Sequence, residues 1–476
     1  MPINSFLYPG AKFIPAYDVA NSLRFDDGSS DYLSKTFSSY DSTKKFTISV
    51  WLKKSANGVH NSIYGKDGAS SSASQFYFDS SSEQLRFYDS TSGSAMDLLT
   101  NRLFRDNSAW YNIILAVDTT QGTASNRVKI YVNGTQETSF ATETYPAQDS
   151  TLKALDSSKD TFIGVGENTS GTKFGYFNGY MAEYVFIDGS QLTPSSFGEF
   201  DEDSPTIWKP KNVSGLTFGT NGFYLDFENS SALGNDISGN DNDFTANNLA
   251  AIDQSTDTCT NNFATMNPLD NYIQGATFSE GNLQVVTGQS GYWAPSLSTI
   301  GLTKGKWYCE IELDTTGGSG AAVGVTAKQI TADAVMGDDA NAHAYLLYDG
   351  QSRTGGTSSS FGDTLANGDV VGIALDLDNN KVYFSKNGTF QASGDPAGNS
   401  NGLAITAPAS TDTGFYHIGV QDVGNGTPGT TYKVNFGSPM YSISSGNADG
   451  NGHGNFEYAV PSGFFALCTK NLAEFG

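Results

Sequence analysis

Residues 127–134 read RVKIYVNG, and this short stretch sets the fold that the rest of the chain repeats. Val128, Ile130 and Val132 recur at alternate positions, which is the period of a β-strand with one buried face. Asn133 and Gly134 follow directly. An Asn-Gly pair favours a type I′ turn, because that turn needs positive φ at both central residues. The stretch therefore predicts one strand of a β-hairpin.

The same alternation extends outward along the first half of the chain. Residues 46–53 (FTISVWLK) place Phe46, Ile48, Val50 and Leu52 on one face. A Ser-rich loop joins residues 75–79 (QFYFD) to residues 84–89 (QLRFYD), which predicts another hairpin. Its inward face is expected to hold Phe76, Phe78, Leu85 and Phe87, and its outward face Tyr77, Arg86 and Tyr88. Residues 161–165 and 179–187 are predicted as further strands.

The second half of the chain returns to the same pattern. Its predicted strands cover residues 283–286, 306–314, 321–325, 344–348, 370–377, 381–385, 416–420 and 432–436. The segment VKIYVNGT of the first half is echoed by KVYFSKNGT in the second. No helix longer than a turn or two is expected, and the best candidate is Thr193–Phe200, with Pro194 at its first position.

Composition narrows the class of protein. The 476 residues include 31 Phe and 24 Tyr, which a disordered acidic chain would lack. Gly is abundant without a fixed period, as expected for many turns. Asp plus Glu number 50 against 26 Lys plus Arg, a net charge of −24 that would repel phosphate backbones. We therefore expect a folded all-β protein without a nucleic-acid partner.

Several other classes of protein lack support in the sequence. No run approaches the ~18 consecutive apolar residues of a membrane span, so no membrane insertion is expected. The N-terminal residues are not expected to form a secretory signal peptide. Cys259, Cys309 and Cys468 are too far apart to predict a disulfide framework or a zinc site.

These patterns predict two antiparallel β-sandwiches joined by an irregular connector. The expected divisions are an N-terminal arm (1–20), a first sandwich (21–190), a connector (191–275), a second sandwich (276–440) and a C-terminal segment (441–476). The arm carries Phe6, Leu7, Phe13 and Ile14 with three prolines. It is expected to pack on a neighbouring subunit or a scaffold, or else on its own sandwich.

Both sandwiches resemble known families. The first resembles the laminin-G-like, concanavalin A-like jelly roll in the segments SLRFDDGSSDYL (22–33), FTISVWLKK (46–54), WYNIILAVDTT (110–120), KIYVNGT (129–135), TFIGVG (161–166) and YFNGYMAEYVFIDG (176–189). The second resembles the SPRY domain in GKWYCEIEL (305–313), AAVGV (321–325), NGDVVGIALDLDNNKVYFSKNGTF (367–390), FYHIGV (415–420) and VNFG (434–437). Residues 225–245 also resemble the opening segment of a laminin-G-like unit.

The combination resembles virion proteins of tailed phages, through FGEFDEDSPTIWKP (197–210) and TNNFATMNPLD (260–270) between the two domains. This resemblance implies a non-enzymatic virion component, either a fibre or a capsid decoration, that is exposed on the particle and binds host-surface carbohydrate. The implied partners are other virion proteins, further copies of the chain and a host glycan. The implied location is the virion surface, after assembly in the host cytoplasm and release by lysis.

Carboxylates suggest a competing enzymatic interpretation. Glu310, Glu312 and Asp314 alternate in EIELD, so their side chains would line one face of a strand. Paired carboxylates of this kind could serve a polysaccharide depolymerase. The alternative is an ordinary solvated strand face with Cys309, Ile311 and Leu313 packed inward, and this is the interpretation favoured. A structural cement protein without a ligand is a further alternative.

Oxygen-bearing side chains also alternate in GNDISGNDND, which contains Asp236, Ser238, Asn240 and Asn242. Such a series could wrap Ca²⁺, although the loop does not match an EF-hand. The favoured interpretation is a turn whose side chains bond the backbone, so no cofactor is expected and Ca²⁺ is the alternative.

Aromatic residues supply the candidate glycan-binding sites. Tyr77, Arg86 and Tyr88 would project together from the first hairpin, where two rings beside a cation suit an acidic glycan. Packing against a neighbouring loop or subunit is the equal alternative. Tyr292, Trp293 and Tyr345 are secondary candidates in the second sandwich.

Overall fold

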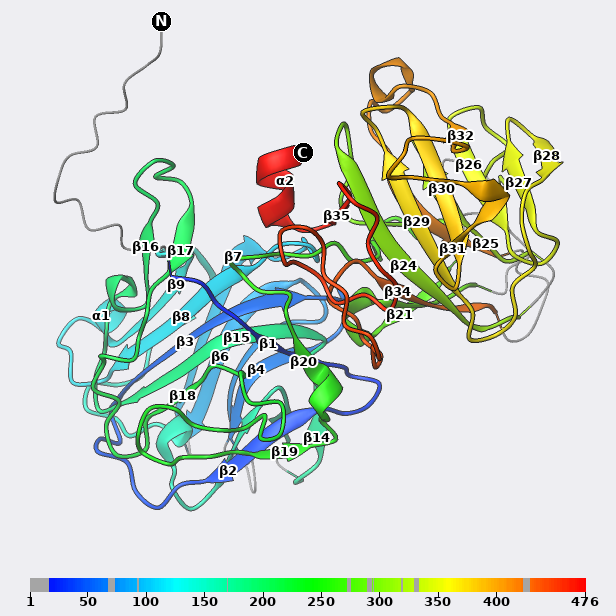
Figure 1. Cartoon of the computed structure of the whole chain (residues 1–476). Coiled ribbons are helices and arrows are strands. Elements are labelled where there is room, and N and C mark those ends of the chain that lie inside the picture. Colours follow the sequence, from blue (N-terminus) through cyan, green and yellow to red (C-terminus); the bar gives the residue numbers. More distant parts are fainter. Residues whose placement is uncertain are drawn as a thin grey trace, which may run out of the picture.

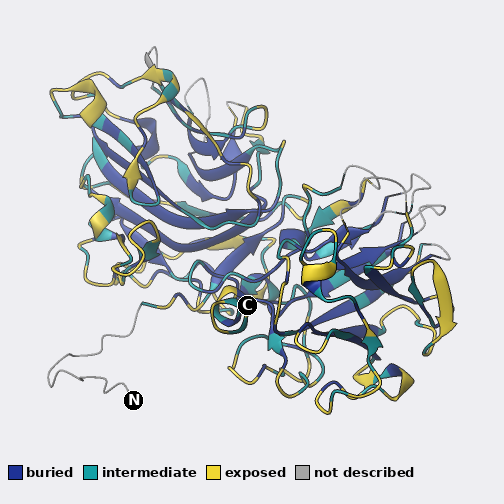
Figure 2. Ribbon diagram, turned by 90° about the horizontal axis from the view of Figure 1, so that it is seen from above, coloured by how far each residue is buried: buried dark blue, intermediate teal, exposed yellow. Residues whose placement is uncertain are grey.

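The computed structural model describes residues 17–66, 73–91, 94–168, 170–271, 275–288, 293, 295–317, 320–328, 334–422 and 429–476. These residues form two β-sandwiches that lie side by side (Figure 1). In each sandwich the strands are mostly buried while the connecting loops are exposed (Figure 2). The predicted all-β class is confirmed.

The first sandwich consists of two facing antiparallel sheets. Sheet 1 has the order β10 (Thr135–Gln136), β9 (Val128–Val132), β8 (Tyr111–Asp118), β3 (Lys45–Lys54), β15 (Gly179–Asp188), β1 (Ser22–Phe25) and β20 (Gln254–Ser255), with β18 (Phe223–Leu225) also paired to β15. Sheet 2 has the order β11 (Phe140–Thr144), β7 (Ser94–Leu103), β6 (Gln84–Thr91), β5 (Ser74–Phe78), β4 (Asn61–Lys66), β12 (Asp160–Ile163), β2 (Tyr32–Thr36) and β19 (Thr245–Asn247).

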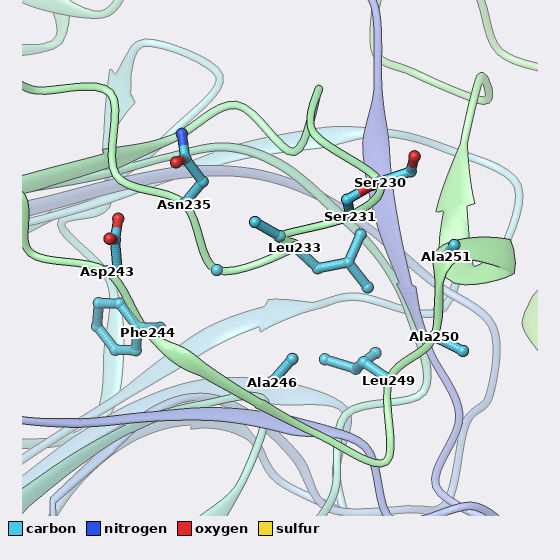
Figure 3. A pocket seen from close by; sticks show the side chains of 12 residues that line it. Ser230, Ser231, Leu233, Asn235, Asp243, Phe244, Ala246, Leu249, Ala250 and Ala251 are labelled. Atoms are coloured by element: carbon cyan, nitrogen blue, oxygen red, sulfur yellow. The ribbon is translucent and has the colours of Figure 1, made fainter.

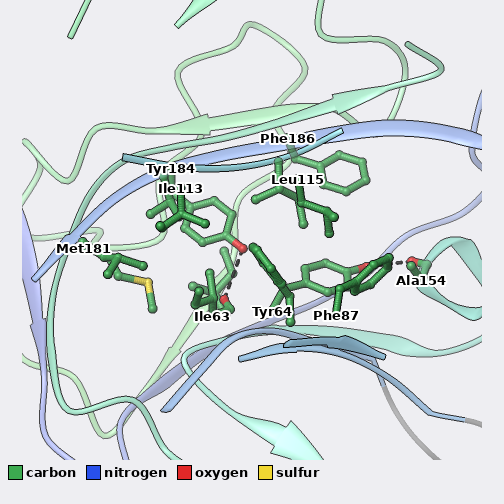
Figure 4. Packing of buried hydrophobic residues seen from close by; sticks show 14 of the residues in the cluster. Ile63, Tyr64, Phe87, Ile113, Leu115, Ala154, Met181, Tyr184 and Phe186 are labelled. Atoms are coloured by element: carbon green, nitrogen blue, oxygen red, sulfur yellow. Dashed lines mark hydrogen bonds between the residues drawn. The ribbon is translucent and has the colours of Figure 1, made fainter. Parts of the chain in front are cut away.

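The alternation read from the sequence determines which side chains fill the space between these sheets. Phe46, Ile48, Val50 and Leu52 of β3 are fully buried in the first core, as predicted. Two buried tyrosines reach carbonyl groups inside this core: the Tyr184 hydroxyl donates to Ile63 O at 3.2 Å, and the Tyr64 hydroxyl to Ala154 O at 2.6 Å (Figure 4). Each hydroxyl thus keeps a hydrogen bond that burial would otherwise remove.

The stretch predicted as a connector supplies strands to both sheets of the first sandwich. β18 pairs with β15, β19 with β2, and β20 with β1. Phe223, Leu225, Phe227, Leu233 and Phe244 of this stretch are buried in the first core. The run GFYLDF (residues 222–227) predicts a strand, and β18 confirms it, whereas the apolar residues around β19 and β20 stand in runs too short to predict strands. Long-range pairing along existing strands orders them instead.

The second sandwich repeats the two-sheet arrangement. Sheet 3 has the order β21 (Thr277–Ser279), β22 (Gln284–Val286), β34 (Thr431–Asn435), β24 (Lys306–Thr315), β29 (Val370–Asp376), β30 (Lys381–Lys386) and β31 (Thr389–Phe390), with β32 (Leu403–Ala404) on β30 and β35 (Phe465–Ala466) on β24. Sheet 4 has the order β23 (Ser296–Leu297), β33 (His417–Gln421), β25 (Ala322–Thr326), β26 (Ala342–Leu346), β27 (Gln351–Thr354) and β28 (Thr357–Ser360).

The remaining elements are short. They are the hairpins β13 (Gly166–Glu167) with β14 (Lys173–Phe174) and β16 (Gly198–Phe200) with β17 (Trp208–Pro210); the helices α1 (Ala124–Arg127) and α2 (Thr469–Phe475); and the 3₁₀ turns η1 (Lys153–Leu155), η2 (Pro194–Ser196), η3 (Ala251–Asp253), η4 (Glu280–Asn282), η5 (Gln391–Ser393) and η6 (Pro408–Ser410). The helix candidate at Thr193–Phe200 is thus a single 3₁₀ turn that begins at Pro194. No helix among the described residues has the length and apolar character needed to cross a membrane.

The two sandwiches share one type of turn. Asn133 and Gly134 have φ of 47° and 75°, and Asn387 and Gly388 have φ of 47° and 79°, as a type I′ turn requires. In each turn the Asn side-chain oxygen accepts a hydrogen bond at 2.8 Å from a backbone amide at the start of the neighbouring strand, at Asn112 and Val370 respectively. The sequence echo between the two halves therefore corresponds to the same local geometry.

A buried polar seam, made of Arg24, Lys53, Asp253, Asp257 and Glu280, lies where the two sandwiches meet, and its Arg24–Glu280 pair crosses from the first sandwich to the second. Arg24 bonds Asp253 at 3.0 Å and Glu280 at 3.1 Å, and its side chain is 1% exposed. Lys53 pairs with Asp257, and both side chains are almost completely buried. Burial lowers the pKa of Lys53 and raises the pKa of Asp257, and each charge partly offsets this for the other.

Further contacts cross the junction beside the seam. The Tyr180 hydroxyl donates to Gly281 O at 3.1 Å, and the Asn282 amide donates to Ser55 O at 2.8 Å. The Tyr180 ring also lies 4.8 Å from the Lys53 ammonium group. The relative placement of the two sandwiches is therefore held by directional contacts at several points.

Lys53→Met should destabilise the protein by about 3–5 kcal/mol, because it leaves the Asp257 carboxylate buried without its cation. The free energy of unfolding is measured by urea titration at pH 7, followed by tryptophan fluorescence. Trp110 is a local reporter, since its indole nitrogen donates to Asp257 at 3.1 Å.

Lys44→Met is the matched control, because it removes a cation from the exposed Lys44–Asp149 pair. That change should cost less than about 1 kcal/mol. Equal effects of the two substitutions would contradict the role assigned to the seam.

Candidate ligand-binding sites

The outward face of the hairpin β5–β6 was the first candidate for a glycan site. Phe76, Phe78, Leu85 and Phe87 are fully buried, so the predicted alternation is correct. Tyr77 lies opposite Arg86 in the strand register, and Tyr88 lies opposite Gln75. The three candidate side chains therefore do leave the sheet on one side.

Tyr77 does not present a free ring, and this part of the prediction is wrong. Its ring stacks on the His60 ring at 4.1 Å with an interplanar angle of 17°, and it is only 7% exposed. His60 in turn contacts Phe174 of the β13–β14 hairpin at 5.0 Å. This hairpin folds over the outer face of sheet 2, a contact that alternation within one strand cannot reveal.

Arg86 and Tyr88 remain half-buried at the surface. Arg86 donates to both carboxylate oxygens of Asp97, at 2.8 and 2.5 Å, so an acidic group of the protein already neutralises it. The hydrogen bond to Asp97 raises the pKa of Arg86. The guanidinium lies 5.8 Å from the Tyr88 ring. An acidic glycan would have to compete with Asp97 for this cation.

The secondary glycan candidates have different positions. Tyr345 is fully buried in the second core, and its hydroxyl donates to Asp363 O, so its predicted role in ligand contact is wrong. Tyr345 lies on the face of β26 that points into the second core. Trp293 is half-buried, and its carbonyl accepts the Ala334 amide at 2.9 Å. Tyr292 lies outside the described residues, as do residues 1–16 of the predicted arm.

The loop considered for Ca²⁺ uses its polar groups internally. Asp236 accepts hydrogen bonds from the backbone amides of Tyr224, Ser238 and Asn242 at 2.8–2.9 Å. The amides of Asn240 and Asn242 donate to backbone carbonyls at Gly219, Thr220 and Gly222. This is the geometry of an Asn/Asp turn. Among the described residues, no group of three or more His, Cys, Asp or Glu is placed to hold a metal.

The EIELD strand has the predicted alternation, but its first carboxylate is not solvated. Glu310 is fully buried, and it accepts the backbone amides of Glu457 and Tyr458 at 2.8 Å each and the Tyr308 hydroxyl at 3.1 Å. Burial raises the pKa of Glu310, and these donors oppose the shift. Glu312 and Asp314 both pair with Lys433. Glu310 thus fastens the C-terminal segment across the outer face of sheet 3.

An acidic residue that the sequence analysis did not single out has an unusual environment. Glu183 lies at a bulge of β15 with a φ of 49° and is 6% exposed. The hydroxyls of Tyr17 and Tyr224 donate to its carboxylate at 2.9 and 2.7 Å. Burial raises the pKa of Glu183 to about 7, and these hydrogen bonds oppose the shift. The sequence feature that could have pointed to this site is a single Glu within the apolar run YMAEYVFI (180–187).

A pocket of about 380 Å³ lies beside β19 at the edge of sheet 2. Its walls come from residues 230–235 and from parts of 243–251. Asn235 and Asp243 stand at one end and Ser230 and Ser231 at the other, with apolar side chains between them (Figure 3). The arrangement combines an apolar floor with polar groups at both ends, which is typical of small-molecule sites.

Fold and sites together define a β-sandwich protein made of binding-type domains. Residues 27–195 match the concanavalin A-like lectin/glucanases superfamily, and residues 306–396 match the SPRY domain. Both domains are therefore present, as the sequence resemblance implied, and they fit a ligand-binding role.

Similar proteins share only part of the chain. Ran-binding protein 9 of Danio rerio is 30% identical over 136 residues, which is 28% of this chain and 20% of that protein. The chain thus spans about a fifth of that relative's length. Among solved structures, the SPRY domain of human HERC1 is 19% identical, with a TM-score of 0.27, over 36% of this chain and 96% of that one. A pentraxin of Limulus polyphemus is 14% identical, with a TM-score of 0.27, over 37% and 80% respectively.

Glu310→Gln should loosen the C-terminal segment, because a Gln amide nitrogen would face backbone N–H donors where a carboxylate oxygen now accepts. Loss of a hydrogen bond to a charged acceptor corresponds to ~1.5–3 kcal/mol, so the Glu457 and Tyr458 amides should exchange roughly 10- to 100-fold faster. Hydrogen exchange resolved by NMR or mass spectrometry measures this. Glu312→Gln on the same strand is the control and should leave exchange at both amides unchanged; equal acceleration would refute the role of Glu310.

Glu183 should make stability fall as the pH rises toward neutrality. Its pKa is about 7 in the folded protein and 4.5 in the unfolded reference, so the folded state binds the proton more tightly. The stabilisation is complete below pH 4.5 and is lost as the pH rises through 7, by up to about 3 kcal/mol. Unfolding free energies at pH 5 and pH 8 should differ less in Glu183→Gln than in the natural chain. Glu199→Gln, on an exposed hairpin, should keep the natural difference; a Glu183→Gln variant that also kept it would overturn the assignment.

Proposed function

We propose that the protein is a non-enzymatic component of a tailed-bacteriophage virion, exposed on the particle as a fibre or capsid decoration, that binds host-surface carbohydrate. The observation that supports this most is the joining of two binding-type sandwiches into one acidic body, across a junction that the Arg24–Glu280 pair spans. A protein built in this way holds ligand-facing loops at fixed positions.

The assignment to a virion is supported by the sequence resemblance to tailed-phage proteins in residues 197–210 and 260–270. The first of these two stretches contains an exposed hairpin. Residues 198–210 form the β16–β17 hairpin, whose Phe200 and Ile207 are 43% and 57% exposed. Exposed apolar side chains on a hairpin offer contact area to a neighbouring virion protein or to another copy of the chain.

The surroundings of the EIELD carboxylates do not favour the depolymerase alternative. A catalytic carboxylate must reach its substrate, whereas Glu310 is covered and bonded to two backbone amides. Glu312 and Asp314 share Lys433. A reducing-end assay on host capsule or lipopolysaccharide tests the alternative directly: sugar release that disappears in Glu312→Gln would favour the enzyme.

The proposed location is tested by electron microscopy of the intact particle, which shows where the protein lies and in how many copies. Density for both sandwiches on the outside of the particle is the expected result. Absence of the protein from purified particles would refute the virion assignment.

Carbohydrate attachment through the hairpin face is tested by particle adsorption. Arg86→Ala and Tyr88→Ala should each weaken adsorption several-fold with little change in melting temperature, because both side chains are half-exposed. Lys44→Ala is the control, because it removes a cation from the exposed Lys44–Asp149 pair elsewhere on the first sandwich. If Arg86→Ala and Tyr88→Ala mainly lower the melting temperature and leave adsorption unchanged, these residues serve packing.

A further inference from the structure

We infer that the pocket beside β19 is a binding site for an uncharged sugar residue of a glycan. This inference rests on the proposed carbohydrate binding and names a site and a ligand chemistry for it. The pocket is formed by residues 230–251, which lie beyond the part of the chain that matches the concanavalin A-like superfamily. It is thus a feature of this chain's own extension of the jelly roll.

The walls of the pocket are held in place by the packing of the first sandwich. Leu233 and Phe244 are buried in the first core, which fixes the two walls that carry them. The Phe244 amide donates to Gly234 O at 2.8 Å and ties the walls together. A Cβ atom at Gly234 would lie 2.1 Å from Phe244 O, so this close approach requires glycine. The cavity therefore does not depend on a loop that is free to collapse.

Its polar groups are available for a ligand. Within the described part of the chain, the Asn235 side-chain amide and the hydroxyls of Ser230 and Ser231 have no protein hydrogen-bond partner. Asp243 uses Oδ1 to accept the Asp236 amide at 2.8 Å and leaves its second oxygen for other donors. Donors and acceptors together suit a ligand that carries several hydroxyl groups, each able to donate and accept.

The floor between the polar ends suits the carbon face of a sugar ring. Leu233, Ala246 and Leu249 lie between the two polar ends (Figure 3). The C–H groups of a pyranose ring can contact such a floor while its hydroxyls reach Asn235 and Asp243 at one end and the serines at the other. A volume of about 380 Å³ falls within the usual range for small-ligand sites.

The negative charge of the pocket and of the whole chain favours neutral sugars over acidic ones. Asp243 is the charged residue among those described as lining the pocket, and the nearby Lys35 ammonium group donates to its backbone carbonyl at 3.1 Å. The chain as a whole has a net charge of −24. A uronic or sialic acid would therefore be repelled without a compensating contact.

A glycan microarray that carries neutral hexose oligomers and matched uronic-acid oligomers tests the inference with the full chain. The natural protein should bind neutral oligomers in preference to acidic ones. Asn235→Ala should weaken this binding by roughly five- to tenfold through loss of hydrogen bonds. Ala246→Trp should abolish it by filling the floor; Ala246 is exposed, so the fold should persist, and thermal melting checks this.

Asn101→Ala is the control, since it removes an exposed amide from β7 near the opposite edge of sheet 2. Unchanged binding in both pocket variants would overturn the pocket inference. Binding of acidic oligomers alone, lost in Arg86→Ala, would also overturn it while the proposed function stands. If the natural protein binds no glycan on the array, the pocket inference and the proposed carbohydrate binding both fall, and microscopy still tests the virion assignment separately.

Discussion

The seam formed by Arg24, Lys53, Asp253, Asp257 and Glu280 is the contact on which the arrangement of the molecule depends. Two of its cations are almost completely removed from water, and each is matched by carboxylates at hydrogen-bond distance or closer. An unmatched charge in such a place would cost several kcal/mol, so sliding or rotation of one sandwich on the other is disfavoured. Apolar contacts alone would tolerate small shifts, whereas the Arg24–Glu280 pair, which crosses from the first sandwich to the second, favours one orientation.

The strands that carry a sustained alternation could be predicted from sequence, because period-two burial is a local property. β3, β24 and β29 are of this kind, and the Asn-Gly turns after β9 and β30 follow from backbone sterics alone. β18 lies within the strand predicted at residues 222–227, whereas β19 and β20 could not be predicted in this way. Each is two or three residues long, and each is ordered by a partner strand distant in sequence.

The candidate sites show the same division between local and distant information. Alternation correctly placed Tyr77 and Glu310 on faces opposite to the cores. It could not show that His60 would cover Tyr77, or that the amides of residues 457 and 458 would meet Glu310 from almost 150 positions away. The pocket beside β19 depends on two stretches brought together by the Gly234–Phe244 contact, so its residues carried no recognisable spacing in the sequence.

The C-terminal segment, held by Glu310 and by a parallel pairing of β35 with β24, has a consequence for how the chain folds. Residues 456–468 bury Tyr308 and Tyr383 on the outer face of sheet 3, and they are synthesised after every strand that they cover. The first sandwich can form while the chain is still being translated, but this face of the second stays bare until residues 456–468 have been made. Closure over so long a sequence separation is slow, so the docking of this segment is expected to be a late step in the folding of the second sandwich.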